Sequence, residues 1–147
     1  MPMLQKISED LKNAMKGGRA LEVETLRMLL ASLKNREIEK RGKGGGELTD
    51  EEVLEVIGRE VKKRREAAEI FAKSSRTDLA DKENKEIEIL GRYLPPQMSK
   101  EEIESVIDAI IQKGTKEFGA VMKEAMKELR GKADGKVVGE IIKSKLI

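Results

Sequence analysis

The sequence contains no cysteine, no histidine and no tryptophan, and it has one tyrosine and two phenylalanines among 147 residues. Without cysteine and histidine, the chain cannot form disulfides, thiolate nucleophiles, zinc-finger sites or a Ser-His-Asp triad. Any acid or base would have to be Asp, Glu, Lys or Tyr, and none of these ordinarily titrates near neutral pH. We therefore expect no autonomous active site, no metal site and no cofactor, and the sequence leaves open whether the protein takes part in catalysis.

Long apolar runs and a large net charge are also lacking. No stretch approaches the roughly 20 consecutive apolar residues of a membrane span, and the first residues have no signal-peptide core. We therefore expect no membrane segment, a cytoplasmic location and a monomer. The formal net charge is only +2, from 30 Lys and Arg against 28 Asp and Glu. That balance argues against a strong overall electrostatic field that would attract nucleic acid, but it permits local basic faces.

Apolar residues at helical spacing fill almost every segment of the chain. The pattern predicts an all-α protein, with an N-terminal bundle of four longer helices over residues 1–95 and a small three-helix unit over 96–147. Pro95 and Pro96 separate the two parts because proline ends helices and disfavours helix in the residue before it. The longer helices are expected at about 4–16, 20–41, 49–73 and 78–93, and the shorter ones at about 99–113, 116–129 and 134–146.

Charged residues interrupt two of the apolar stripes. Arg64 falls within the stripe of the third helix, and Glu83 and Glu86 fall on the stripe of the fourth. If these helices form an antiparallel hairpin, Arg64 lies opposite Glu86, and a charge on an apolar face needs a partner. We therefore predict a structural ion pair of Arg64 with Glu86 or Glu83. An exposed Arg64 and a ligand-binding Arg64 remain alternatives.

A basic turn near the C-terminus is the best candidate for ligand binding. Residues 113–147 hold nine Lys or Arg and five Asp or Glu. Glycines allow close approach to the backbone, and a helix N-terminus offers free donors to a phosphate. A structural interpretation is compatible with this one, because Gly131 can end one helix and Asp134 can cap the next. The predicted nucleic-acid contacts are Arg130, Lys132, Gly135 and Lys136.

Five segments together resemble the GatB/YqeY family, which includes free-standing YqeY-like proteins and the tail domain of the GatB component of glutamine-dependent tRNA amidotransferases. The segments are LRMLLASLKNREIEKR (26–41), LTDEEVLEVI (48–57), KRREAAEIF (63–71), YLPPQMSKEEI (93–103) and GKADGKVV (131–138). The resemblance implies tRNA or amidotransferase subunits as partners. It also implies a family-level activity described as carbon–nitrogen ligation with glutamine as amido-N-donor.

Three hypotheses about function follow from these observations. The first is a tRNA-binding or tRNA-amidation accessory module, and the second is a helical adaptor for other proteins without RNA affinity. The third is an autonomous enzyme, although the sequence shows no amidase Ser-Lys arrangement, no ATP loop and no cluster of metal ligands. We therefore do not expect the chain to be catalytic by itself.

Overall fold

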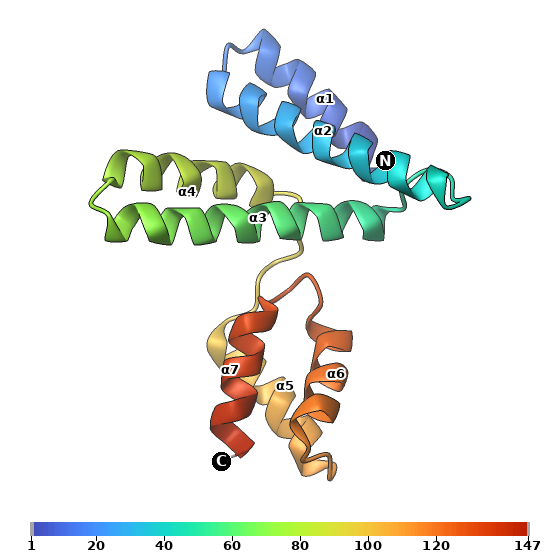
Figure 1. Ribbon diagram of the computed structural model, residues 1–147, viewed down its shortest axis with the longest axis vertical. Coiled ribbons are helices and arrows are strands. Elements are labelled where there is room, and N and C mark those ends of the chain that lie inside the picture. Colours follow the sequence, from blue (N-terminus) through green and yellow to red (C-terminus); the bar gives the residue numbers. More distant parts are fainter. Residues whose placement is uncertain (1, 147) are drawn as a thin grey trace. The chain divides into compact units, whose positions relative to one another are not determined.

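The computed structural model describes residues 2–146, and every regular element among them is an α-helix. The all-α prediction is therefore confirmed. The chain divides into two compact units, Met1–Leu94 and Pro95–Ile147. The helices, drawn in Figure 1, are α1 (Met3–Lys16), α2 (Ala20–Gly42), α3 (Asp50–Lys73), α4 (Thr77–Gly91), α5 (Lys100–Gln112), α6 (Phe118–Leu129) and α7 (Gly135–Leu146).

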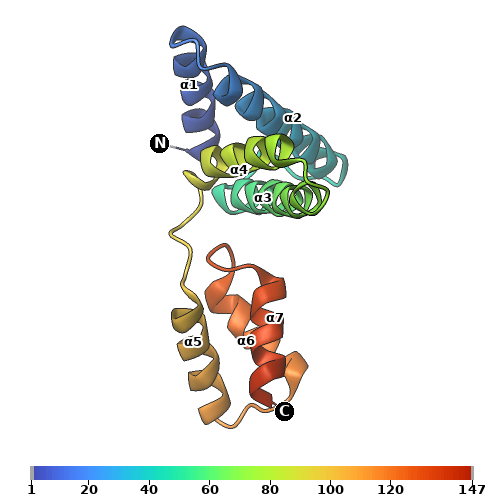
Figure 2. The same cartoon turned by 90° about the vertical axis from the view of Figure 1, so that its left-hand side faces the viewer.

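The N-terminal unit consists of two helical hairpins, α1–α2 and α3–α4, packed against each other (Figures 1 and 2). Burial of aliphatic side chains from all four helices holds the unit together, since removing apolar surface from water is the main favourable term in folding. The most fully buried members of this core are Ile7, Leu26, Leu29, Leu33, Val53, Ile57 and Leu90.

A capping box begins α3, where Glu52 follows Thr49 at the three-residue spacing that favours one. The Thr49 hydroxyl accepts a hydrogen bond from the Glu52 backbone, and the Glu52 carboxylate accepts one from the Thr49 backbone. Lys40, near the end of α2, also donates to the Glu52 carboxylate. The bonds from Lys40 and Thr49 lower the pKa of Glu52 to about 2. One carboxylate therefore starts a helix and also ties that start to the preceding helix.

The last helix of the N-terminal unit, α4, ends at Gly91, two residues earlier than predicted. The Tyr93 and Leu94 amides donate to the carbonyls of Leu90 and Gly91, each at 3.2 Å, so the chain tightens into a turn. Proline explains the early end, because Pro95 disfavours helical geometry in the residue before it. The turn directs the Tyr93 hydroxyl to the Asp10 carboxylate of α1, to which it donates a hydrogen bond.

The contact between Tyr93 and Asp10 predicts a loss of stability in alkali. Burial first, and the bond to Asp10 second, raise the pKa of Tyr93 above its ordinary value of 10.0. The contribution of Tyr93 to stability is therefore complete below that value and declines as the pH rises above it. We expect the wild type to lose up to about 1.4 kcal/mol more per pH unit than Tyr93→Phe in this range. Urea unfolding between about pH 9 and pH 11 measures the difference, and equal losses would contradict the assignment. Tyr93 is the only tyrosine, so no other phenol contributes.

The C-terminal unit is a three-helix arrangement of α5, α6 and α7 (Figure 2). A second capping box begins α5, where the Ser99 hydroxyl accepts from the Glu102 backbone and the Glu102 carboxylate accepts from the Ser99 backbone. All three helices contribute aliphatic side chains to one small core. Its buried members are Ile103, Ile107, Ile110, Val121, Ala125, Leu129, Val138, Ile141 and Ile142.

Candidate functional site

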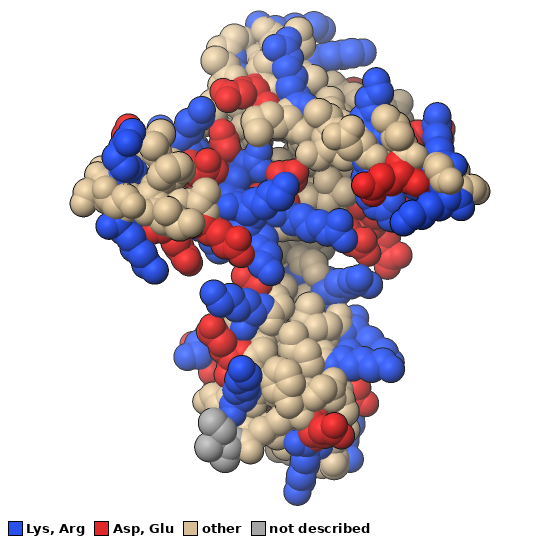
Figure 3. Space-filling model, viewed as in Figure 1, with Lys and Arg blue, Asp and Glu red and all other residues tan. Residues whose placement is uncertain are grey.

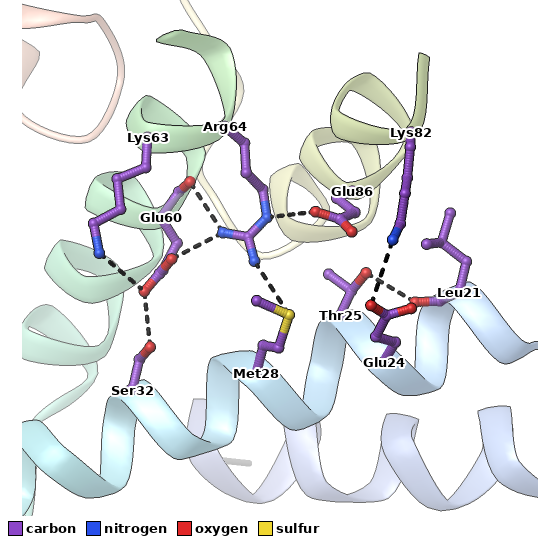
Figure 4. Close-up of polar contacts among 10 residues, drawn as sticks. All are labelled: Leu21, Glu24, Thr25, Met28, Ser32, Glu60, Lys63, Arg64, Lys82 and Glu86. Atoms are coloured by element: carbon purple, nitrogen blue, oxygen red, sulfur yellow. Dashed lines mark hydrogen bonds and ion pairs between the residues drawn. The ribbon is translucent and has the colours of Figure 1, made fainter. Parts of the chain in front are cut away.

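Arg64 of α3 is buried, with 6% of its surface exposed, and lies opposite Glu86 of α4, which is 5% exposed. Its Nε donates to Glu86 Oε2 at 2.9 Å (Figure 4). A second nitrogen, Nη1, donates to Glu60 Oε2 at 2.8 Å. The remaining nitrogen, Nη2, lies 4.0 Å from Met28 Sδ of α2. All three guanidinium nitrogens therefore contact groups of the protein itself, which favours a structural role over ligand binding.

Glu60 is the partner of Arg64 that the sequence analysis missed. It lies one helical turn before Arg64, and that spacing brings side chains together on a helix surface. Its other oxygen accepts from the Ser32 hydroxyl of α2 at 2.7 Å. Burial alone would raise the pKa of Glu60, but the hydrogen bonds from Ser32 and Arg64 outweigh it and lower that pKa. Glu60 therefore remains a carboxylate and links α2 to α3.

Glu83 lies near this network without joining it. Among residues 2–146, the carboxylates bonded to Arg64 are Glu60 and Glu86. Partial burial, and then the nearby charge of Glu86, raise the pKa of Glu83. For Arg64 the hydrogen bonds from its side chain to Glu60 and Glu86 outweigh burial, so its pKa is raised and it stays charged. Arg64 and Glu60 are therefore both held in their charged forms by the hydrogen bond between them.

The predicted nucleic-acid contacts surround the turn between α6 and α7. Gly131 has a φ of +79°, a backbone conformation that favours glycine, and it lets the chain reverse after α6. The Lys132 amide then donates to the Leu129 carbonyl at 2.8 Å. Two bonds from the segment before α5 tie the turn in place: Gln97 Nε2 donates to the Gly131 carbonyl at 3.0 Å, and the Met98 amide donates to the Lys132 carbonyl at 2.9 Å.

Asp134 caps α7, as the structural interpretation of the turn predicts. Its Oδ1 accepts from the Lys136 amide at 3.0 Å. A carboxylate of the chain itself therefore occupies the anion-binding position at this helix end. The side chains of Arg130, Lys132 and Lys136 remain exposed on the surface. A phosphate at this turn would thus meet cationic side chains rather than the free N-terminus of α7.

Gly135, the fourth predicted contact, is half-buried and begins α7. A Cβ atom added there would lie 3.8 Å from Met126 Cε and 3.9 Å from Met122 Cε, which is ordinary van der Waals distance. Gly135 therefore borders the packing between α6 and α7.

The two glycines of the turn make a matched pair for mutation. Gly131→Ala places a side chain in the left-handed region, and we expect it to lower the free energy of unfolding by about 1 kcal/mol. Gly135→Ala adds a methyl group at an uncrowded helical position, so we expect unchanged or slightly higher stability. Chemical denaturation of both variants measures the difference. Equal losses would show that the conformation at Gly131 is not what requires glycine.

Comparison with known proteins shows which family the chain belongs to. A family model described as Yqey-like protein matches residues 4–146. The chain belongs to the YqeY family. Among curated relatives of this YqeY-family chain, one from Clavispora lusitaniae is named "Altered inheritance of mitochondria protein 41, mitochondrial". It is 39% identical over 103 residues, which cover 69% of this chain and 58% of the relative. A protein of the same name from Lachancea thermotolerans is 29% identical over 147 residues, with 96% and 77% covered.

A further relative belongs to an amidotransferase. It is the E-type component of the glutamyl-tRNA(Gln) amidotransferase of Methanocaldococcus jannaschii, and it is 46% identical over 57 residues, which cover 33% of this chain and 9% of that protein. This YqeY-family chain is therefore related, through part of its length, to the GatB/GatE group of amidotransferase proteins. It spans little more than half the length of the Clavispora relative.

The prediction of a cytoplasmic location is contradicted by these relatives, because several of them are named as mitochondrial proteins. That prediction relied on the lack of an apolar span and of a secretory signal, and neither feature separates one aqueous compartment from another. Within residues 2–146, no helix of this YqeY-family chain is both long and apolar enough to cross a membrane. The same residues contain no group of three or more His, Cys, Asp or Glu that could hold a metal ion.

Proposed function

We propose that this YqeY-family protein is a tRNA-binding accessory module related to the glutamine-dependent tRNA amidotransferases. The observation that carries the proposal is the segment shared at 46% identity with a protein whose name specifies glutamyl-tRNA(Gln). The exposed cations Arg130, Lys132 and Lys136 supply chemistry suited to a phosphate backbone, because lysine and arginine bind phosphate through charge-assisted hydrogen bonds.

In this proposal the protein contributes RNA binding and leaves amide transfer to another protein of a complex. In its buried network, the carboxylates of Glu60 and Glu86 both accept hydrogen bonds from Arg64. Carbon–nitrogen ligation with glutamine as amido-N-donor would then be a property of a complex with amidotransferase subunits. The hydrogen bonds from Gln97 and Met98 hold the basic turn in one conformation, which lowers the entropy lost on binding.

A salt titration with tRNA tests the proposal. Each phosphate neutralised on a duplex contributes about −0.9 to the slope of log affinity against log salt, so three contacts predict a slope near −2.7. We expect the double variant Lys132→Ala, Lys136→Ala to reduce the magnitude of that slope by roughly 2 without loss of folding. Fluorescence anisotropy with labelled tRNA at several salt concentrations measures it.

Lys12→Ala with Lys16→Ala is the matched control, because it removes the same charge from two exposed positions of α1. This control should leave the slope within about 0.5 of the wild type. Equal slopes for the two double variants would show that the turn is not the contact. If the wild type does not bind tRNA even at low salt, the tRNA proposal fails and the adaptor hypothesis replaces it.

A further inference from the structure

The C-terminal unit carries an apolar strip along the line where α6 meets α7. We define the α6–α7 strip as Phe118, Met122 and Met126 of α6 with Gly135 and Gly139 of α7. The methionine methyl groups lie 3.8 and 3.9 Å from the position a Cβ would take at Gly135. Phe118 Cζ lies 3.9 Å from the corresponding position at Gly139. Phe118 is 39% exposed, and the two methionines are half-buried.

The order of residues along α6 explains why the strip reaches the surface. Val121 and Ala125 are fully buried in the core. Met122 and Met126 follow them by one residue each, which turns the methionines about 100° around the helix, so that they pack at the edge of the core, beside α7. The next residues, Lys123 and Lys127, are exposed. The strip therefore lies between the core on one side and a row of lysines on the other.

Cations outnumber acids along the edges of the strip. On α7 the exposed residues beside the two glycines include one acid, Glu140. Lys143 also packs against the strip, with its Nζ 6.0 Å from the centre of the Phe118 ring. In Figure 3, residues other than Lys, Arg, Asp and Glu cover the middle of the visible face of the C-terminal unit, and Lys and Arg, together with some Asp and Glu, lie around it. The cations at the edges are Lys123, Lys127, Arg130, Lys136 and Lys143.

We propose that the α6–α7 strip binds a short amphipathic helix with acidic flanks from a partner protein. Methionine side chains are flexible and polarizable, which suits them to receiving the apolar face of a helix. The surrounding cations would pair with carboxylates on both sides of that face. From Phe118 to Met126 the strip extends about 12 Å along α6, and this length matches roughly two turns of a bound helix.

The same features disfavour other occupants. A second copy of the chain would bring like charges together at both edges of the strip, and such juxtaposition is repulsive. Single-stranded RNA binds through bases stacked on aromatic rings. The strip offers one ring, Phe118, and Lys143 already lies against it. This site is distinct from the proposed tRNA site, although Arg130 and Lys136 belong to both surfaces. The experiments that test it therefore use the two methionines and Lys143, which are not among the proposed tRNA contacts.

Methyl NMR of the full chain labelled at methionine tests the proposal. The probe is a synthetic peptide of about 14 residues with Leu at positions i, i+3, i+4 and i+7 and Glu on both flanks. We expect it to shift the methyl signals of Met122 and Met126. The signals of Met15 and Met28 should not move, although these residues are 52% and 49% exposed in the N-terminal unit. A peptide of the same composition in scrambled order, and one with Lys in place of Glu, should shift neither pair.

Substitutions locate the contact independently. Met122→Gln with Met126→Gln keeps side-chain size and should weaken peptide affinity about tenfold, a difference of about 1.4 kcal/mol. Met15→Gln with Ile38→Gln removes apolar groups that are 52% and 59% exposed elsewhere, and it should have no effect. Lys143→Glu should also weaken binding, while the methionine variants leave the salt slope for tRNA unchanged because they alter no charge. Unmoved Met122 and Met126 signals at saturating peptide, equal shifts with the scrambled peptide, or shifts produced by RNA instead would each overturn the proposal.

Discussion

Arg64→Ala should lower the free energy of unfolding by about 3 kcal/mol, because it leaves the buried carboxylate of Glu86 without its cation. Glu86 is buried and would lose the donor at 2.9 Å from its Oε2. Glu60 would keep the hydroxyl of Ser32 but lose the donor at 2.8 Å. The truncation also removes the packing of a long side chain against Met28. Urea denaturation followed by circular dichroism gives the value directly.

Lys62→Ala, an exposed cation two residues earlier on the same helix, is the matched control and should change stability by less than about 0.5 kcal/mol. The double variant Arg64→Met, Glu86→Leu replaces the buried charges by apolar groups, so it should lose less stability than Arg64→Ala alone. A loss below about 0.5 kcal/mol for Arg64→Ala would show that the pair does not contribute as its burial indicates.

Leu129→Ala should cost about 2–4 kcal/mol, because this side chain is fully buried in the small core shared by α5, α6 and α7. A unit of this size has little apolar surface to bury and therefore has little stability to spare. We expect hydrogen exchange to accelerate most at the amides of α5, α6 and α7. The measurement is exchange by mass spectrometry of peptides from the whole chain.

Lys127→Ala, two residues before Leu129 on the exposed side of α6, serves as the control and should leave exchange unchanged within error. Equal acceleration in α1–α4 for Leu129→Ala would contradict the view that this side chain stabilises the C-terminal core in particular.

The sequence predicts the helical class well because the helical period and the capping residues are local signals. Ser99 with Glu102 and Thr49 with Glu52 form the capping boxes that their spacing indicates. The ion pair of Arg64 and Glu86 was also predicted from a local signal, which is a charged residue on an otherwise apolar stripe. A buried charge is unfavourable unless it is paired.

Local signals of this kind do not predict contacts between segments that are far apart in the sequence. The contribution of Ser32 to the network depends on how one hairpin packs on the other, and no periodicity encodes that crossing. The bonds from Gln97 and Met98 to the basic turn likewise join residues more than 30 positions apart. The cap at Asp134 could be predicted from the sequence, but the amide that it binds, that of Lys136, became apparent only in the structure.

The network around Arg64 does not oppose the opening of every internal boundary of the N-terminal unit equally. Both carboxylates bonded to Arg64 belong to the α3–α4 hairpin, so separating this hairpin from α1–α2 breaks no pair of Arg64. Separating the hairpins breaks the hydrogen bond from the Ser32 hydroxyl to Glu60 and exposes the Arg64 network to water, while Arg64 keeps both of its carboxylate partners. Separating α3 from α4, in contrast, would pull Arg64 away from Glu86 in an apolar setting. The ion pairs that join the two hairpins, Lys40–Glu52 and Lys82–Glu24 among them, are more exposed than the pair of Arg64 and Glu86. Exposed pairs contribute less to stability, so water screens the opening between the hairpins better than it screens the opening of the second hairpin.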